Sequence, residues 1–338
     1  MPFRIKAWVK SIFSFHHRGK WPIDVHPIDL SSLKAPSKDQ PFQPIDLSSL
    51  KASSAHPVFL EDVNGEDDII IALMGAAGVG KTSFIRAVAG PDSKWMQEHD
   101  VHELTFGTHA VNCIKIKIDG TQSHLVLVDT PGLYNPLRSD IDVLSVIADW
   151  LKESYVTGKK LNGIVYLHSI TDIRFDHESN VPIDRAFTLF QNICGRNISD
   201  RVCITTTQWN NVTPELKCQY EELEERLKRN QWGAFLARKS VMSRFDSSTD
   251  EIARDTALRT LKYLVENTDM KTRVVMNIQG EMTKWENSHA HRKTAADLVE
   301  ESGAYFLEFM ESLILRPDND KLHNPPTIMD DIARYQGL

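Results

Sequence analysis

Three glycines and a lysine follow an aliphatic run in the segment IIIALMGAAGVGKTSFI, residues 69–85. Gly75, Gly80, Lys81 and Thr82 match the spacing G-x-x-x-x-G-K-[ST]. Small residues allow consecutive backbone N–H groups to approach a phosphate chain, and the helix that follows directs its positive dipole end at the same place. A glycine-rich turn without a ligand is the alternative. The aliphatic strand before the loop and the helix-forming SFIRAVA after it favour phosphate binding.

The phosphate-binding interpretation gives the residues of this loop separate roles. Lys81 is expected to reach the β- and γ-phosphates as a catalytic group, and the Thr82 hydroxyl is expected to ligate Mg²⁺. The loop residues predicted to bind the nucleotide are Gly75, Ala76, Ala77, Gly78, Val79, Gly80, Lys81, Thr82 and Ser83.

A second motif, D-x-x-G, lies in the segment HLVLVDTPGL. Asp129 ends an aliphatic strand, where its carboxylate can hold the Mg²⁺ shell, and Gly132 can present its N–H to the γ-phosphate as part of the catalytic set. Between the two motifs, Thr108 is expected to close over the metal and the γ-phosphate, as both a catalytic residue and a metal ligand. Thr105 is the alternative, and an ordinary capping hydroxyl is the other interpretation of either threonine.

The segments GAAGVGKTS and VDTPGL, with a threonine-bearing loop between them, resemble the septin-like, AIG-type (immunity-associated) P-loop GTPases and the chloroplast import receptors of that group. The segments LNGIVYLHSITDIRF and VCITTTQW are similar to fungal G-domain-containing proteins. The similarity extends over residues 69–266. It implies a G domain that binds GTP or GDP with Mg²⁺, acts as a nucleotide switch and forms a homodimer through its nucleotide face.

The guanine-reading motif of such proteins, N/T-K-x-D, is absent at the corresponding position. Thr206, Thr207, Gln208 and Trp209 stand there and provide no carboxylate. Trp209 is able to stack on a purine, while Gln208 or Asn210 is able to hydrogen-bond its edge. Thr207, Gln208 and Trp209 are therefore the predicted base-binding residues. Packing of Trp209 within the protein is the alternative, and an ATPase stays open.

A second departure concerns hydrolysis, because Leu133 follows Gly132 where many GTPases have a glutamine that orients water. Hydrolysis is therefore expected to be slow unless a partner or a second copy stimulates it. Arg86 and Arg138 are candidates to stabilise transition-state charge, although a solvated arginine is the ordinary interpretation of each. A nucleotide-dependent assembly module with negligible hydrolysis is the competing function.

These residues must be positioned by strands that alternate with helices, a pattern that predicts a doubly wound α/β fold with a mostly parallel sheet. One expected strand, residues 111–118, has a polar face typical of an edge or antiparallel strand. The other expected strands are residues 69–74, 125–129, 163–168, 202–206 and 241–245. The expected helices are residues 140–153, 214–228, 249–266 and 290–315.

The composition is that of a globular protein, with 338 residues of which 41% are hydrophobic. The formal net charge of −7 argues against a nucleic-acid binder, since phosphate-backbone binding needs concentrated positive charge. Four dispersed cysteines without a C-x-x-C pair are typical of reduced residues in a cytoplasmic protein.

Three regions are expected along the chain: a disordered segment 1–65, a G domain 66–268 and a helical extension 269–338. Residues 1–23 carry basic and aromatic residues at helical spacing, which suits a membrane surface, a targeting peptide or packing on the protein. The sequence PIDLSSLKA occurs at residues 27–35 and again at 44–52. A duplicated linker is the simpler interpretation of this repeat, and a pair of docking motifs is the alternative.

Overall fold

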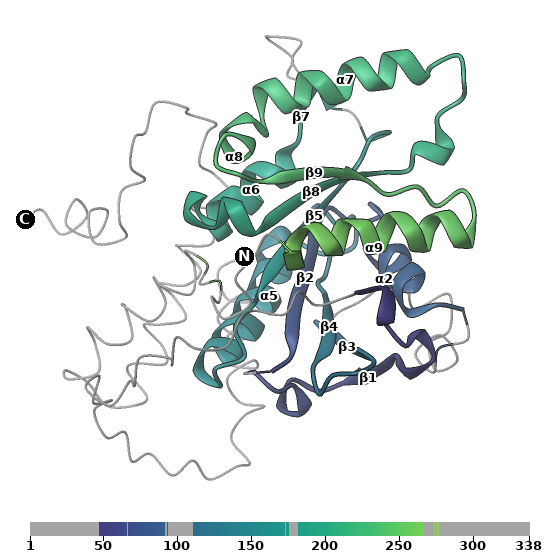
Figure 1. Cartoon of the computed structure of the whole chain (residues 1–338). Helices are drawn as coiled ribbons and strands as arrows, with labels where there is room; N and C mark the ends of the chain where they lie inside the picture. Colours follow the sequence, from purple (N-terminus) through teal and green to yellow (C-terminus); the bar gives the residue numbers. More distant parts are fainter. Residues whose placement is uncertain are drawn as a thin grey trace, which may run out of the picture.

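The computed structural model describes residues 47–65, 67–91, 93, 111–172, 174–175, 182–266, 274 and 276. Its centre is a seven-stranded sheet in the order β1-β3-β4-β2-β5-β8-β9 (Figure 1). These strands are β1 (His56–Val58), β2 (Ile69–Gly75), β3 (Asn112–Lys117), β4 (His124–Asp129), β5 (Gly163–Ser169), β8 (Val202–Thr207) and β9 (Val241–Arg244). A separate ribbon pairs β6 (Arg174–Phe175) with β7 (Pro182–Ile183).

The sheet is parallel from β4 through β2, β5 and β8 to β9. This arrangement confirms the doubly wound α/β class and brings the carboxyl ends of these strands to one edge, where such folds bind ligands. β3 is antiparallel to β4, as its polar face predicted. It is not an edge strand, because β1 pairs with its other side from His56–Lys115 to Val58–Cys113.

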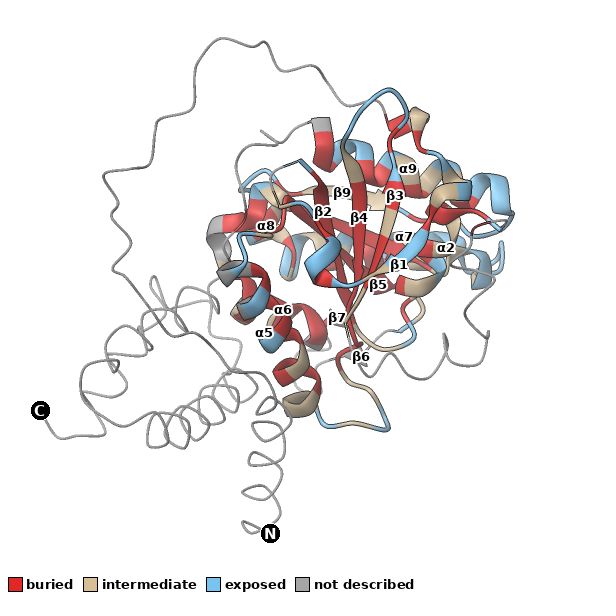
Figure 2. Ribbon diagram, turned by 90° about the horizontal axis from the view of Figure 1, so that it is seen from below, coloured by how far each residue is buried: buried red, intermediate tan, exposed pale blue. Residues whose placement is uncertain are grey.

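Helices cover both faces of the sheet, so its strands are buried between two apolar clusters (Figures 1 and 2). One face carries α5 (Asp140–Val156), α6 (Arg185–Cys194) and α8 (Gly233–Leu236). The other face carries α2 (Lys81–Ala89) and α9 (Asp250–Glu266). The remaining helix, α7 (Lys217–Asn230), contacts α8 and β7. Burial on both faces explains why β2 is an uninterrupted aliphatic run.

Residues 47–65, the last part of the segment expected to be disordered, form short elements that pack on the sheet. Short 3₁₀ turns at Leu47–Ser49, Ala52–Ser54 and Leu60–Asp62 flank β1, and Leu47, Leu50 and Ala55 are buried. The sequence of this region has only weak periodicity, so its elements were not predicted. They are stabilised by pairing with β3. Two more 3₁₀ turns, Arg196–Arg201 and Trp209–Asn211, flank β8.

Both ends of the chain lie largely outside the described residues. Residues 1–46, the expected helix 290–315 and nearly all of the expected extension 269–338 belong to those parts. Val274 is an exception, since it bridges to Leu161 and is buried. Within the described ranges, no helix combines the length and the apolar character needed to cross a bilayer.

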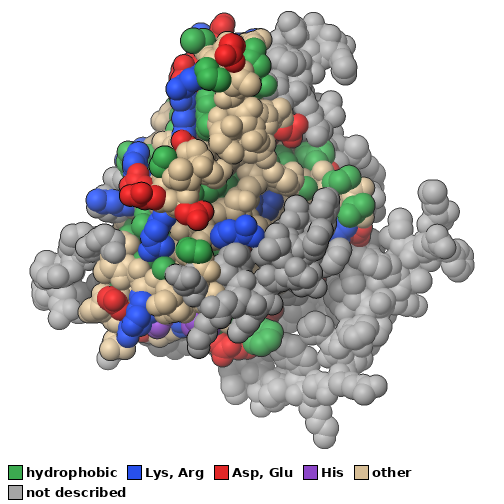
Figure 3. All heavy atoms as spheres, turned by 90° about the vertical axis from the view of Figure 1, so that its right-hand side faces the viewer, with side chains coloured by type: hydrophobic (Ala, Val, Ile, Leu, Met, Phe, Trp, Pro, Cys, Tyr) green, Lys and Arg blue, Asp and Glu red, His purple; other side chains and the backbone are tan. Residues whose placement is uncertain are grey.

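Positive and negative side chains are interspersed on the side of the molecule that Figure 1 draws on the right (Figure 3). The described part of this face therefore does not present charge of a single sign.

Candidate nucleotide site

The loop between β2 and α2 has backbone conformations that its glycines make possible. Gly78 and Gly80 have φ angles of 79° and 100°, a left-handed region that other residues rarely adopt. Gly75 lies so close to β5 that an added Cβ would be 2.3 Å from the carbonyl oxygen of Leu167. The loop therefore curls over the end of the sheet and delivers the chain to the first turn of α2.

Lys81 starts α2, and its side chain folds back over the loop. Its Nζ donates hydrogen bonds to the carbonyl oxygens of Ala76, at 2.8 Å, and Gly75, at 3.3 Å. Burial lowers the pKa of the Lys81 amine to about 8, and the neighbouring Asp129 carboxylate opposes this shift. The amine is thus mainly protonated at neutral pH and placed over the curled loop, where it can pair with phosphate oxygens.

Thr82 and Asp129 bring two oxygen ligands together beside this amine. The Thr82 hydroxyl donates to Asp129 Oδ2 at 3.1 Å. Asp129 is buried, and its Oδ1 has no hydrogen-bond partner among the described residues. Burial raises the pKa of Asp129, while Lys81 and Thr82 oppose the rise. An unsatisfied buried carboxylate oxygen beside a hydroxyl fits the hard oxygen-ligand preference of Mg²⁺, which usually keeps several waters.

The D-x-x-G segment lies directly against the phosphate loop. Ala77 N–H donates to the carbonyl oxygen of Leu133 at 2.7 Å, and Leu133 N–H donates to that of Gly75 at 3.1 Å. An added Cβ on Gly132 would be 2.5 Å from Ala77 Cα, so this position requires glycine. We call these two hydrogen bonds the loop clasp. One loop amide that could face a phosphate is engaged by Leu133 in this structure.

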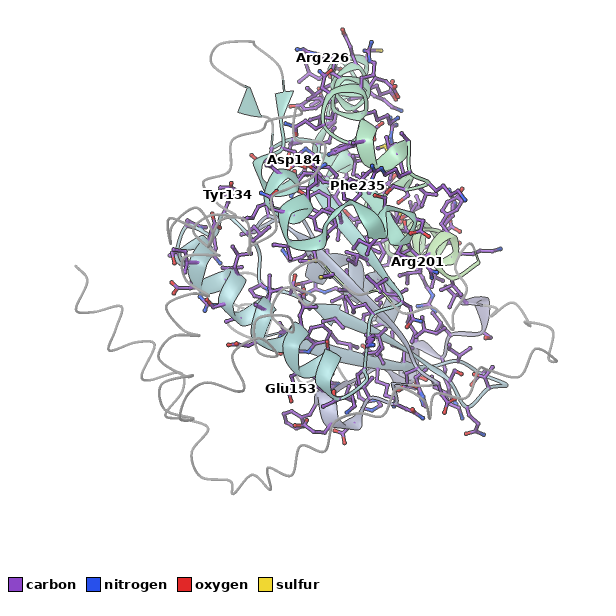
Figure 4. The ribbon with its side chains drawn as sticks, turned by 90° about the vertical axis from the view of Figure 1, so that its left-hand side faces the viewer. Tyr134, Glu153, Asp184, Arg201, Arg226 and Phe235 are labelled. Atoms are coloured by element: carbon purple, nitrogen blue, oxygen red, sulfur yellow. The ribbon has the colours of Figure 1, made fainter. Side chains whose placement is uncertain are left out.

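The side chain of Leu133 points into the apolar core. It is 1% exposed and packs within the cluster that includes Val143 of α5. The following Tyr134 has a φ of 53°, and its N–H donates to Asp140, the first residue of α5, at 2.6 Å (Figure 4). Backbone geometry, and not only the residue type, therefore keeps the side chain at position 133 away from the phosphate loop.

The remaining phosphate-end candidates are only partly described. Thr108 and its alternative Thr105 lie outside the described residues. Arg86 lies on α2, and its Nε is buried without a hydrogen-bond partner in the described part of the chain. Arg138 is half-buried just before α5. A catalytic role for any of these residues stays a prediction.

At the end of β8, two predicted base-site residues hold the phosphate loop. Thr207 Oγ1 donates to the Val79 carbonyl oxygen at 2.7 Å, and Gln208 Nε2 donates to that of Gly78 at 2.8 Å. Gln208 Oε1 in turn accepts from the Thr171 hydroxyl at 2.9 Å. The segment after β8 therefore lies beside the loop, as its position in the chain predicted, but the Gln208 amide is already engaged there.

Trp209 is held in a polar network of β8, β9 and α7. Its indole N–H donates to Thr206 Oγ1 at 3.0 Å, and the Arg244 guanidinium carbon lies 4.0 Å from the ring centroid. Glu224 accepts hydrogen bonds from both Thr206, at 2.7 Å, and Arg244, at 2.6 Å. One face of the indole is thus covered by protein. Nothing in the local pattern of TTTQW predicts this arrangement, because Glu224 and Arg244 come from other elements.

Near the end of β5 lies a buried cluster of three polar side chains that the sequence did not predict. His168 Nδ1 lies 2.9 Å from Asp184 Oδ2, and the Tyr166 hydroxyl donates to the same carboxylate at 2.9 Å. Asp184 also caps α6 by accepting from Phe187 N–H at 3.0 Å (Figure 4). Asp184 raises the pKa of His168 although burial opposes this. The available signal was Asp184 before the amphipathic run of α6, an N-cap pattern.

Comparison with known proteins agrees with this geometry. Residues 70–185 match the family model described as 50S ribosome-binding GTPase. A search of curated proteins finds no match.

Several solved structures share the general arrangement at low identity. Toc33 from Arabidopsis thaliana, solved as a dimerization-deficient mutant, is 13% identical with a TM-score of 0.45, covering 62% of this chain and 88% of that chain. The structure of Toc33 with GDP and Mg²⁺ is 15% identical with a TM-score of 0.44, covering 63% of this chain and 88% of that chain. Era from Aquifex aeolicus is 12% identical with a TM-score of 0.40, covering 66% of this chain and 67% of that chain. These likenesses are too distant to assign a function.

The family model covers the phosphate loop, the D-x-x-G segment and the strands that position them. The sequence spacing and the curled backbone of Gly75–Ser83 agree with that match. Residues 70–185 therefore combine an α/β fold consistent with the G domain of P-loop GTPases with the two motifs that such domains use at their phosphate site.

Proposed function

We propose that this protein is a Mg²⁺-dependent GTP-binding switch that hydrolyses GTP slowly unless a partner or a second copy stimulates it. The observation that carries the proposal is the cluster of Lys81, Thr82 and Asp129 at the phosphate loop. It combines a buried amine with a hydroxyl–carboxylate pair separated by 3.1 Å and a carboxylate oxygen that has no partner among the described residues. A triphosphate with its metal would satisfy all three groups.

In this proposal the residues predicted at the phosphate and metal site keep their roles. Residues 75–83 bind the phosphates, Thr82 and Asp129 hold Mg²⁺ through direct or water-mediated contacts, and Thr108 completes the metal site. Gly132 reports the γ-phosphate.

The loop clasp offers a physical basis for switching. Ala77 N–H bonds to Leu133 at 2.7 Å, so a phosphate oxygen that used this amide would compete with the Leu133 carbonyl. Nucleotide binding would then bias the D-x-x-G segment toward a different position, and loss of the γ-phosphate would restore the clasp. Because Tyr134 N–H bonds to Asp140, this displacement would reach the start of α5.

Isothermal titration with GTP, GDP and ATP in Mg²⁺ tests the proposal. We expect guanine nucleotides to bind more tightly than ATP, and Lys81→Ala to abolish this binding. Lys217→Ala is the matched control, because Lys217 is an exposed residue at the start of α7. Preferential ATP binding would favour the ATPase alternative, and no binding of any nucleotide would contradict the proposal.

A second function is supported by the burial of Leu133, which cannot orient water. In this alternative, nucleotide stabilises an assembly and hydrolysis is negligible. Turnover and oligomeric state measured over a range of protein concentrations separate the two. Turnover that rises with concentration indicates activation through a homodimer at the nucleotide face, whereas nucleotide-dependent assembly without turnover indicates the scaffold.

Two finer proposals follow from the sequence. The motifs support a place near the AIG-type GTPases, and residues 1–23 have the composition of a segment that contacts an anionic membrane surface. Flotation with anionic liposomes, using the chain with and without residues 1–23, tests the membrane contact. Equal flotation of the two chains would contradict it.

A further inference from the structure

Residues 47–52, the described part of the second copy of PIDLSSLKA, lie against β3 of the sheet. Leu47 and Leu50 are 3% and 6% exposed, and both belong to the apolar cluster that includes Ile116 and Ile118 of β3. The turn containing Leu47 contacts α9, and the turn that begins at Ala52 contacts α2 and β3. We call this place, formed by β3, α2 and α9, the repeat groove.

Backbone hydrogen bonds fix the register of this copy. Lys51 N–H donates to the Lys117 carbonyl oxygen at 3.0 Å, and Asp119 N–H donates to that of Ser49 at 3.1 Å. Ser54 Oγ accepts from Lys117 N–H at 2.9 Å. The copy thus adds to the edge of β3 beyond β1, with leucines buried and main-chain groups paired. This combination is the recognition mode of a peptide added to a sheet edge.

The first copy has the same groups at the same spacing. Leu30, Ser32 and Leu33 correspond to Leu47, Ser49 and Leu50 after a shift of 17 residues, the distance from Pro27 to Pro44. The correspondence extends past the repeat, because Ser37 corresponds to Ser54.

Two positions after the repeat differ between the copies. Pro36 replaces Ser53, a position in the first turn of a 3₁₀ helix where proline is tolerated. The match ends at Lys38, because its counterpart Ala55 is fully buried.

We propose that the repeat groove is a binding site for this motif and that residues 27–37 of the same chain are its second occupant, in exchange with residues 44–54. With the first copy bound, residues 38–55 would form a loop that rejoins the sheet at β1. Binding of the first copy would cost the entropy of closing that loop. It would also require Lys38 to stay out of the buried position that Ala55 fills, so we expect the second copy to be the major occupant. The exchange would bring the basic segment 1–23 closer to the G domain by the length of one repeat.

Thiol crosslinking in the full chain tests the exchange without disturbing the buried leucines. In a Cys218→Ser background, which removes the exposed native thiol, Asp119→Cys is combined with Ser49→Cys or Ser32→Cys and treated with a short crosslinker. We expect rapid crosslinking for position 49 and slower crosslinking within the monomer for position 32. Asp39→Cys, which lies outside the match, is the control and should react at least tenfold more slowly than position 32.

Hydrogen exchange at the groove provides the second readout. In Leu47→Ala/Leu50→Ala, the amides of Lys117 and Asp119 should keep protection, and adding Leu30→Ala/Leu33→Ala should remove it. Leu30→Ala/Leu33→Ala alone should change nothing. Three outcomes would overturn the proposal. They are equal crosslinking of positions 32 and 39, a position-32 crosslink that forms only between molecules, and complete loss of protection in Leu47→Ala/Leu50→Ala.

Discussion

The two ends of the candidate site differ in which groups remain free to meet a ligand. At the phosphate end, the Lys81 amine lies over the curled loop beside Thr82, and Asp129 keeps one oxygen unpaired among the described residues. At the base end, Gln208 bonds to Gly78, and Trp209 is covered on one face by Arg244. The first end therefore presents charged and oxygen-bearing side chains to a ligand, whereas the second has committed its side chains to the protein.

This difference separates binding strength from base selectivity. Charge-assisted contacts to phosphate are available in the structure and do not depend on which base is attached. Reading a base requires unpaired donors or acceptors at its edge, and the engaged Gln208 amide offers fewer of them. We therefore expect phosphate-end changes to affect all nucleotides similarly and base-end changes to act mainly on selectivity or folding.

The strongest test of the comparison is Lys81→Ala. Removing the ammonium should weaken GTP and ATP alike by at least roughly a hundredfold, about 3 kcal/mol, because the phosphates lose a partly desolvated charge partner. Titration calorimetry with both nucleotides measures the effect, and Lys217→Ala serves as the control. A loss confined to one nucleotide would show that the phosphate end also selects the base.

Leu133→Gln tests whether position 133 acts through its backbone alone. Burying an amide in the cluster around Val143 should lower the free energy of unfolding by about 1–3 kcal/mol without raising GTP turnover. Urea unfolding and single-turnover hydrolysis are the measurements. Leu133→Met, which keeps an apolar side chain of similar volume, should cost less than about 1.5 kcal/mol. Faster hydrolysis in the glutamine variant would mean that the D-x-x-G segment moves much further than the clasp suggests.

The pH dependence of binding sharpens the account of the phosphate end. Burial lowers the pKa of Lys81 to about 8 in the free protein, whereas bound phosphate favours the protonated amine. Affinity should be nearly constant below that pKa. Above it, affinity should fall by roughly tenfold per pH unit, since binding then requires uptake of a proton. Titrations between pH 7 and pH 9 measure this slope, and Lys81→Arg, which stays charged, should flatten it.

The smallest expected effect lies at the base end. Arg244→Met should leave nucleotide affinity within about threefold while lowering unfolding free energy by about 1 kcal/mol, through loss of the contact over Trp209 and of the bonds to Glu224. Thermal unfolding and titration with GTP and ATP check both parts. A large loss of GTP affinity with ATP unchanged would instead place Arg244 and Trp209 in base recognition.

Much of this fold could be predicted because its signals are local. The strands around residues 69–74 and 125–129 are aliphatic runs, and the loop at Gly75–Ser83 is recognised by its local spacing, although Leu133, Thr207 and Gln208 hold it in the fold. α6 was not predicted although Asp184 before its amphipathic run is a local N-cap signal, whereas the contacts of Asp184 with His168 and Tyr166 depend on residues from another strand. The elements within residues 47–58 were not predicted, because these residues pair with β3 and show no clear periodicity of their own.

By itself the sequence determined the α/β class and the positions of the two motifs predicted to bind phosphate and Mg²⁺, since these follow from short spacings and local hydrophobic patterns. Only the tertiary structure decided that Leu133 points into the core, that Trp209 lies against Arg244 and that one copy of the repeat lies along β3. The physical reason is that side-chain direction and edge pairing depend on contacts between segments far apart in the chain. A short local pattern cannot specify such contacts.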